Sequence, residues 1–170
     1  NEDGYIEKGY ENLLLQSNSF DTTWTTFNAS VTSGQSGYDG SNDAWLLSKS
    51  NADGQIRQNA TSSGVITFSV YAKASASTWL RMITIGTSRD QFFDLQNGVL
   101  GSAPLGSVVN ATIQSVGNGF YRCSLSVNDS SMSAVRIYPA DGNGDTSGTS
   151  GSIYIQDAML NQGMVSYPYV

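Results

Sequence analysis

The sequence has no histidine and only one cysteine, Cys123, among its 170 residues. Without histidine, neither a Ser-His-Asp nor a Cys-His catalytic site can form, and the commonest metal-binding side chain is missing. A single cysteine excludes a disulfide within the chain, so this is not a small scaffold held by disulfides. Cys123 alternates with polar neighbours, which favours a small buried core residue over a nucleophile.

Positive charge is also scarce. Eight Lys and Arg residues face 14 Asp and Glu residues, and the net charge is −6. The eight cations are scattered and form no basic cluster. Because affinity for nucleic acid comes largely from Lys and Arg on phosphates, we predict no nucleic-acid partner and no binding to anionic membranes. No apolar run is long enough to cross a bilayer or to act as a signal segment, so we also predict no membrane insertion.

Turn residues and strand-like alternation fill the rest of the chain. The stretch GNGFYRCSLSV at 117–127 opens with a turn signal and then alternates apolar and polar side chains. Residues 65–73 alternate in the same way, with Ile66, Phe68, Val70 and Ala72 on the predicted inner face. These patterns predict an all-β fold, a single antiparallel β-sandwich of about ten short strands with little or no helix. We place it at residues 11–170, after a lead-in at residues 1–10.

The predicted strands follow one another at short intervals. They lie at residues 12–17, 44–49, 55–58, 65–73, 79–85, 91–95, 108–116, 117–127, 134–138 and 153–160. Residues 20–27, with three aromatic side chains, are either a strand or a packed loop. The strands at 65–73 and 79–85 are expected to form a hairpin or a pair that crosses between sheets.

Carboxylates that could catalyse glycoside hydrolysis do not form a recognisable pair. The candidates are Asp39, Asp43, Asp53, Asp90 and Asp94. Together with the missing histidine, this predicts a protein that is not an enzyme.

A calcium site is suggested by the loop after residue 140. Asp141, Asn143 and Asp145 place oxygen-bearing side chains at alternate positions, as in loops that wrap this cation. No glutamate completes the EF-hand pattern. The alternative is a glycine-rich hairpin loop with solvated Asp and Asn side chains.

Carbohydrate binding would use aromatic rings that stack on sugars and polar side chains that bond to hydroxyl groups. Tyr71 shares the outer face of its predicted strand with Thr67 and Ser69. Trp79 shares parity with Arg81. The candidate carbohydrate-binding residues are Tyr38, Tyr71, Trp79, Arg81 and Arg122. The alternative for each aromatic ring is packing in the core or between the sheets.

Several segments, taken in order, are similar to one family. They are IEKGYENLLLQSNSF, VITFSVYAKASASTWLRM, FDLQNG, VGNGFYRCSLSV, a Gly-Asp loop and SIYIQDAMLNQGMVSYPYV. Together they resemble the jelly-roll domains of phage virion proteins, such as tail fibres, other appendages and capsid-decorating proteins. The chain departs from that family at Gln156, where the family has an aromatic residue. Its last residues match the family's ending only loosely.

The resemblance implies a jelly roll that is similar in turn to jelly-roll carbohydrate-binding modules. In those modules a structural calcium lies between the first and last strands, which here implies Asp157 and Glu11 as ligands. The expected function is a non-catalytic virion structural module, a homotrimer that contacts other virion proteins. It would serve assembly, attachment to host-surface polysaccharide, or both. The alternative is a carbohydrate-binding module of a secreted, extracellular polysaccharide-degrading enzyme.

Overall fold

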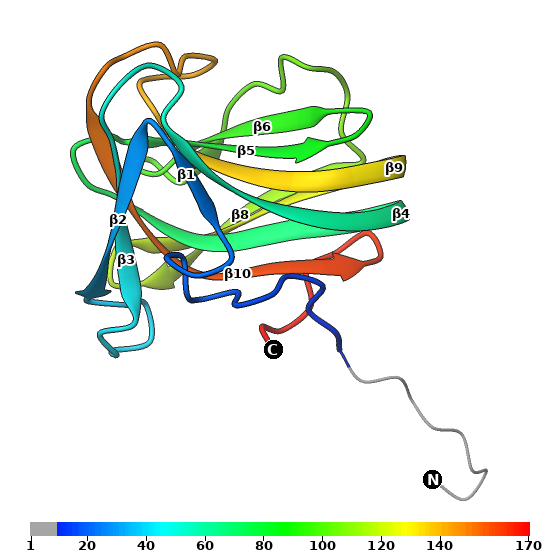
Figure 1. Ribbon diagram of the computed structural model, residues 1–170, viewed down its shortest axis with the longest axis horizontal. Helices are drawn as coiled ribbons and strands as arrows, with labels where there is room; N and C mark the ends of the chain where they lie inside the picture. The colour runs from blue at the N-terminus through cyan, green and yellow to red at the C-terminus, as the bar shows by residue number, and fades with distance from the viewer. Residues whose placement is uncertain (1–9) are drawn as a thin grey trace, which may run out of the picture.

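The computed structural model describes residues 10–170, which contain ten β-strands and no helix. Every pair of neighbouring strands is antiparallel (Figure 1). The predicted all-β sandwich is therefore confirmed. The strands are β1 (Thr25–Phe27), β2 (Ala29–Gln35), β3 (Ala44–Lys49), β4 (Gln55–Ala74), β5 (Trp79–Ile85), β6 (Arg89–Asp94), β7 (Val99–Leu100), β8 (Asn110–Gly117), β9 (Phe120–Ala140) and β10 (Gly151–Gln162).

The two longest strands, β4 and β9, belong to both layers of the sandwich and run side by side (Figure 1). The second half of β4 and the first half of β9 lie with β2, β3, β10 and β8 in a layer that we call sheet 1. Their other halves lie with β1, β5, β6 and β7 in sheet 2. The β4–β9 register shifts between Asn59 and Gly64, where Gly64 adopts a φ of +92°. Such an irregularity bends a strand, and here it lets β4 pass from one sheet to the other.

The core lies between the two sheets. The predicted inner side chains of β4, Ile66, Phe68, Val70 and Ala72, are fully buried. They join one apolar cluster with Met82 and other side chains from sheet 2. Cys123 belongs to the same cluster, and burial raises the pKa of its thiol well above the ordinary value. It is a core residue, as the sequence predicts.

Several predicted strands need correction. The strands at 55–58 and 65–73 are one strand, β4, and those at 117–127 and 134–138 both fall largely within β9. β5 pairs with β9 and β6 and not with β4, so residues 65–73 and 79–85 do not form a hairpin. They lie in different sheets, which agrees with the other expectation, a pair that crosses between sheets.

The apolar run at 12–17 is not a strand. The Asn12 side-chain oxygen accepts hydrogen bonds from the amides of Leu14 (3.1 Å) and Leu160 (3.1 Å). An Asn side chain that bonds to its own backbone two residues on favours a turn over a strand. Of the three leucines, only Leu14 is buried, while Leu15 is 69% exposed.

The expected lead-in, apart from Tyr10, lies outside the described residues. The Tyr10 ring stacks on Tyr167. Among the described residues there is no helix that is long and apolar enough to cross a membrane.

Candidate functional site

Three of the predicted sugar-binding residues come together on the outer face of sheet 1. The rings of Tyr38 and Tyr71 stack in parallel, with centroids 3.8 Å apart. The Arg122 guanidinium lies 5.3 Å from the Tyr71 ring centroid. Tyr71 is only 9% exposed, so this group is packed against itself and offers no broad ring face to a ligand.

The Tyr38 hydroxyl donates a hydrogen bond of 2.8 Å to the Asp157 carboxylate. Burial raises the pKa of Tyr38 far above its ordinary value, and the Asp157 charge adds to the shift. Burial also raises the pKa of Asp157, and repulsion from Asp39 and Asp43 acts in the same direction. The buried Asp157 carboxylate therefore has a tyrosine hydroxyl as its partner.

The C-terminal segment covers much of the remaining outer face of sheet 1. Its backbone carbonyls at Gly163 and Met164 accept hydrogen bonds from Thr67 (2.8 Å) and Ser126 (2.9 Å). Arg122 donates to the Tyr167 carbonyl. Thr67, Ser126 and one end of Arg122 are thus bonded to the chain itself, although Ser69 Oγ and Arg122 Nε have no hydrogen-bond partner. Because this segment covers the face, we look for a ligand site elsewhere.

Trp79 and Arg81, the other two candidates, lie on sheet 2. The core of the sandwich therefore lies between them and Tyr38, Tyr71 and Arg122. The Arg81 guanidinium lies between the rings of Tyr138 and Phe92, 5.1 Å and 5.4 Å from their centroids. Its Nε donates a 3.0 Å ion-paired hydrogen bond to Asp90. Three neighbours therefore fix the direction of this guanidinium.

Beside Arg81, the outer face of sheet 2 is hollowed by a groove of about 620 Å³. We call it the sheet-2 groove. β1, β4, β5 and β9 supply most of its side chains. It is lined by Thr25, Thr26, Phe27, Asp53, Gln55, Arg57, Arg81, Arg136 and Tyr138.

Strand pairing explains why these side chains meet. Arg57 lies directly opposite Thr25 on β1 and Arg136 on β9, while Arg81 lies opposite Tyr138. Residues opposite one another point to the same face of a sheet. These side chains therefore lie on one outer face in two adjacent rows, with Thr25, Arg57 and Arg136 in one and Tyr138 and Arg81 in the other.

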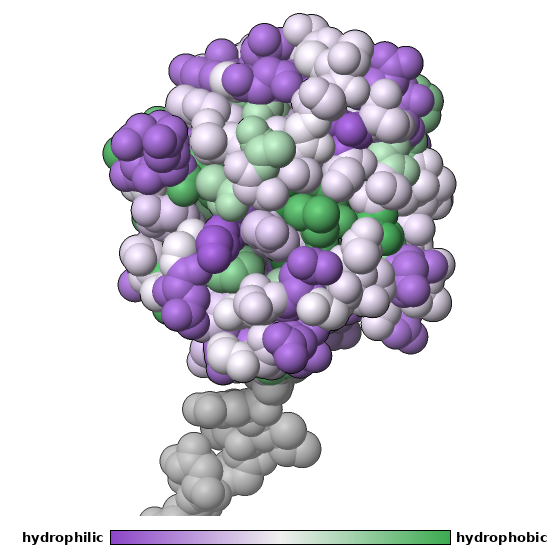
Figure 2. All heavy atoms as spheres, turned by 90° about the vertical axis from the view of Figure 1, so that its left-hand side faces the viewer, coloured by the Kyte–Doolittle hydropathy of each residue, from purple (hydrophilic) through white to green (hydrophobic). Residues whose placement is uncertain are grey.

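Two polar atoms on this face have no hydrogen-bond partner. Among the described residues, five buried side-chain atoms lack one, and two of them, Gln55 Oε1 and Arg136 Nε, belong to the groove. At its rim the Phe27 side chain is 53% exposed. On the face in Figure 2, apolar side chains form small patches among hydrophilic ones. An exposed ring beside unpaired polar groups can bind a polar ligand that has an apolar face.

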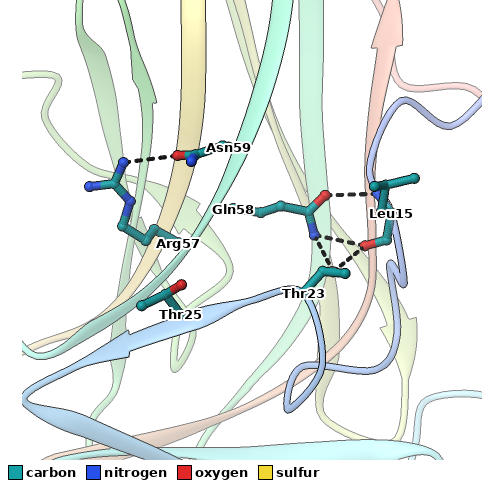
Figure 3. A pocket seen from close by; sticks show the side chains of 6 residues that line it. All are labelled: Leu15, Thr23, Thr25, Arg57, Gln58 and Asn59. Carbon is teal, nitrogen blue, oxygen red and sulfur yellow. Dashed lines mark hydrogen bonds between the residues drawn. The ribbon is translucent and has the colours of Figure 1, made fainter.

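A second hollow, of about 400 Å³, shares Thr25 and Arg57 with the sheet-2 groove and extends to Asn59. In Figure 3 the Arg57 guanidinium points toward Asn59, to which it donates a 3.0 Å hydrogen bond. Gln58 points to the other side of β4. Its amide binds both backbone groups of Leu15, at 2.7 Å each, and thereby holds the segment that leads into β1.

The oxygen atoms of the predicted calcium loop already accept hydrogen bonds from other residues of the chain. Asp141 accepts hydrogen bonds from Lys49 (2.6 Å) and the Gly148 amide (2.8 Å). Asn143 accepts from Ser102, and Asp145 accepts from Ser147.

Of the remaining predicted ligands, Asp157 is bonded to Tyr38, and Glu11 precedes the turn-forming Asn12. Over residues 10–170 no group of three or more Asp, Glu or Cys side chains is arranged to hold a metal ion. Calcium binding stays a prediction.

The sequence did not single out Phe27, Gln55, Arg57 or Arg136. The alternation of side chains along a strand could have indicated them, since Gln55 and Arg57 are two residues apart on one strand and Arg136 and Tyr138 on another, so each pair points to one face. That signal has meaning only once β4 and β9 are known to be neighbours throughout their length.

No protein-family model and no curated protein matches the sequence. Solved structures do match. The CBM22-1 xylan-binding domain of Paenibacillus barcinonensis Xyn10C has a TM-score of 0.54 at 13% identity, over 95% of this chain and 100% of that one. The CBM22-1-GH10 modules of Clostridium thermocellum Xyn10B, complexed with xylohexaose, give 0.51 at 11% identity over 95% of this chain. The enzymatically active domain of bacteriophage CBA120 tailspike protein 4 gives 0.48 at 17% identity over 88% of this chain.

The chain spans only 21% of the tailspike chain and 29% of the Xyn10B chain. At these identities the likeness shows the fold alone. The domain has a jelly-roll fold like that of carbohydrate-binding modules.

Proposed function

We propose that this chain is a non-catalytic carbohydrate-binding domain whose ligand lies in the sheet-2 groove. The observation that carries the proposal is the exposed Phe27 ring beside buried, unpartnered polar atoms of Gln55 and Arg136. A sugar ring has apolar faces that stack on an aromatic ring and hydroxyl groups that donate and accept hydrogen bonds. Both atoms lie beneath the groove surface, so their side chains must turn outward to bond to a pyranose that stacks on Phe27.

The shape of the site fits a chain better than a single sugar. The sheet-2 groove continues past Arg57 into the hollow beside Asn59, so one extended ligand can contact both. The two neighbours with TM-scores above 0.5 support a glycan of this kind, since one is a xylan-binding domain and the other is complexed with xylohexaose.

The test is retardation in native gels that contain xylan, galactan or an acidic polysaccharide, with a glycan array to widen the search. We expect retardation by at least one of them. Phe27→Ala should weaken binding about ten-fold or more, since base- and sugar-sized rings stacked on aromatic side chains contribute about 1–3 kcal/mol. Leu105→Ala is the matched control, because Leu105 is also an exposed apolar side chain, 44% exposed, but does not line the groove.

Absence of binding by the folded wild-type chain on the whole array would contradict the proposal. Equal binding by wild type and Phe27→Ala would place the site elsewhere. In both cases the melting temperature of each variant must match that of the wild type.

We further propose that the domain belongs to a phage fibre, tail or capsid-decorating protein in the virion. There it would form a homotrimer that contacts other virion proteins and attaches to host-surface glycans. The support is the resemblance of segments such as VGNGFYRCSLSV to the jelly-roll domains of phage virion proteins. The alternative is a binding module of a secreted enzyme. A trimer mass in solution supports the first, and a monomer that binds a plant polysaccharide supports the second.

The non-catalytic part of the proposal has its own test. The chain, incubated with each polysaccharide that it binds, should release no new reducing ends. Release that persists in a preparation purified to one component would overturn it.

A further inference from the structure

Positive charge concentrates in the sheet-2 groove. Arg57, Arg81 and Arg136 line it, and they are three of only eight Lys and Arg residues in a chain of net charge −6. Three guanidinium groups in one hollow are more than a neutral sugar needs.

Two of these arginines lie directly opposite one another. Arg57 on β4 and Arg136 on β9 are register partners in sheet 2, and both are partly buried. Like charges directly opposite on neighbouring strands repel and destabilise the sheet. The pair therefore has a structural cost that an anion between the two side chains would remove.

No carboxylate of the described residues forms an ion pair with either arginine. Within residues 10–170, Arg57 bonds to the Asn59 amide oxygen and Arg136 to the Tyr138 hydroxyl, and neither forms an ion pair. Asp90 is paired with Arg81. Asp53, at the rim, accepts a 2.6 Å hydrogen bond from Thr146.

We infer that the groove takes an acidic saccharide, whose carboxylate or sulfate group binds between Arg57 and Arg136. This inference rests on the proposed function and adds the class of ligand. A guanidinium presents its N–H groups in a planar fork that matches a carboxylate or sulfate in two-point contact. The unpartnered Nε of Arg136 is one such donor. Arg81 lies beside the pair, held between two rings, and its charge is balanced by Asp90.

The test compares matched ligands by calorimetry at 50 mM and 300 mM NaCl. One pair is hexagalacturonate and its methyl-esterified form, and the other is a sulfated galactohexaose and galactohexaose itself. We expect the wild-type chain to bind the acidic member of at least one pair about ten-fold or more tightly than its neutral partner. The preference should shrink at the higher salt concentration. The pair that shows it distinguishes a carboxylate ligand from a sulfate ligand.

Arg57→Gln and Arg136→Gln should each lower affinity for the acidic member much more than for the neutral member, and so remove most of this preference. The loss is about ten- to hundred-fold for the acidic member, the range of a hydrogen bond to a charged group. Arg136→Lys keeps the charge but loses the planar fork, so its loss should be intermediate. Lys73→Gln, on sheet 1, removes the same charge at another face and should change nothing.

The outcomes separate the two claims. If acidic and neutral members bind equally, or if Lys73→Gln weakens binding as much as Arg57→Gln, the acidic preference is wrong. The proposed function then stands as long as Phe27→Ala still lowers affinity for the neutral member. If no member binds and the glycan array is blank, the proposed function itself has failed. Melting temperatures of Arg57→Gln and Arg136→Gln at or above the wild-type value show that lost binding is not lost folding.

Discussion

The clamp that Gln58 forms on the segment before β1 leads to a prediction about both stability and binding. Gln58 is 4% exposed, and its amide makes three hydrogen bonds, to the Leu15 amide, the Leu15 carbonyl and the Thr23 hydroxyl. Gln58→Met keeps the length and volume of the side chain and removes all three. The segment that it holds continues directly into Thr25–Phe27, which forms one wall of the sheet-2 groove.

The size of the effect follows from the three bonds. A hydrogen bond contributes about 0.5–1.5 kcal/mol net to folding, so the three together contribute about 1.5–4.5 kcal/mol. Leu15 is 69% exposed, and water can bond to its backbone groups after the substitution. We therefore expect the lower part of that range, about 1.5–3 kcal/mol. For a domain of this size the melting temperature should fall by about 2–4 °C for each kcal/mol.

Urea unfolding followed by tryptophan fluorescence measures the loss, and glycan affinity measures the position of β1. Gln114→Met is the matched control, because Gln114 is exposed on β8 and forms no hydrogen bond from its side chain to residues 10–170. A free energy of unfolding within about 0.5 kcal/mol of the wild-type value would refute the reasoning about the clamp. If stability falls while affinity stays constant, the wall of the groove does not depend on Gln58.

Three further predictions concern carboxylates. Asp129 is buried, which by itself would raise its pKa, but hydrogen bonds from Ser131 and Thr87 lower the pKa below its usual range. A carboxylate with a lowered pKa stabilises the folded state at pH values above its unfolded pKa of about 4, and this stabilisation is lost as the pH falls. Asp129→Ala should therefore lower the free energy of unfolding, measured with urea, by about 2–3 kcal/mol at pH 7 and by less at pH 2.5. Asp157 has the opposite sign, since its raised pKa makes the ionised form unfavourable as pH rises above about 4. Asp157→Asn, which suits the φ of +50° and still accepts from Tyr38, should be more stable than wild type at pH 7 and equal at pH 3.5; a loss at pH 7 would contradict this. Calcium at the Asp141–Asp145 loop would have to displace existing hydrogen bonds, so we expect weak, millimolar binding that raises the melting temperature by a few degrees and is lost in Asp145→Asn; no shift at about 10 mM calcium would contradict it.

Alternation alone was sufficient to predict the core. Ile66, Phe68, Val70 and Ala72 repeat every second residue, and all four are fully buried between the sheets. A strand whose side chains alternate in polarity has little freedom about which face turns inward. The same local rule explains why Cys123 could be assigned to packing.

Alternation could not predict which outer face is open. Thr67, Ser69 and Tyr71 occupy the outer side of β4, yet all three are buried. Thr67 is covered because the carbonyl of Gly163 accepts its hydroxyl, and Tyr71 because Tyr38 stacks on it. These contacts join positions far apart in the sequence, and one of them uses a backbone atom that every residue has. No pattern of side chains in the sequence predicts these contacts.

The two outer faces differ because of what the rest of the chain does to each. On sheet 1, the loop that carries Tyr38 stacks on Tyr71, and the segment from Gly163 onward accepts hydrogen bonds from Thr67 and Ser126. On sheet 2, β1 has only three residues and lies along only part of β4, so it borders the row of Gln55 and Arg57 without covering it. A polar atom that is buried without a partner costs about 1–3 kcal/mol. Gln55 Oε1 and Arg136 Nε carry that cost on sheet 2, as Ser69 Oγ and Arg122 Nε do on sheet 1, so the open groove and the exposed Phe27 ring are what distinguish the two faces.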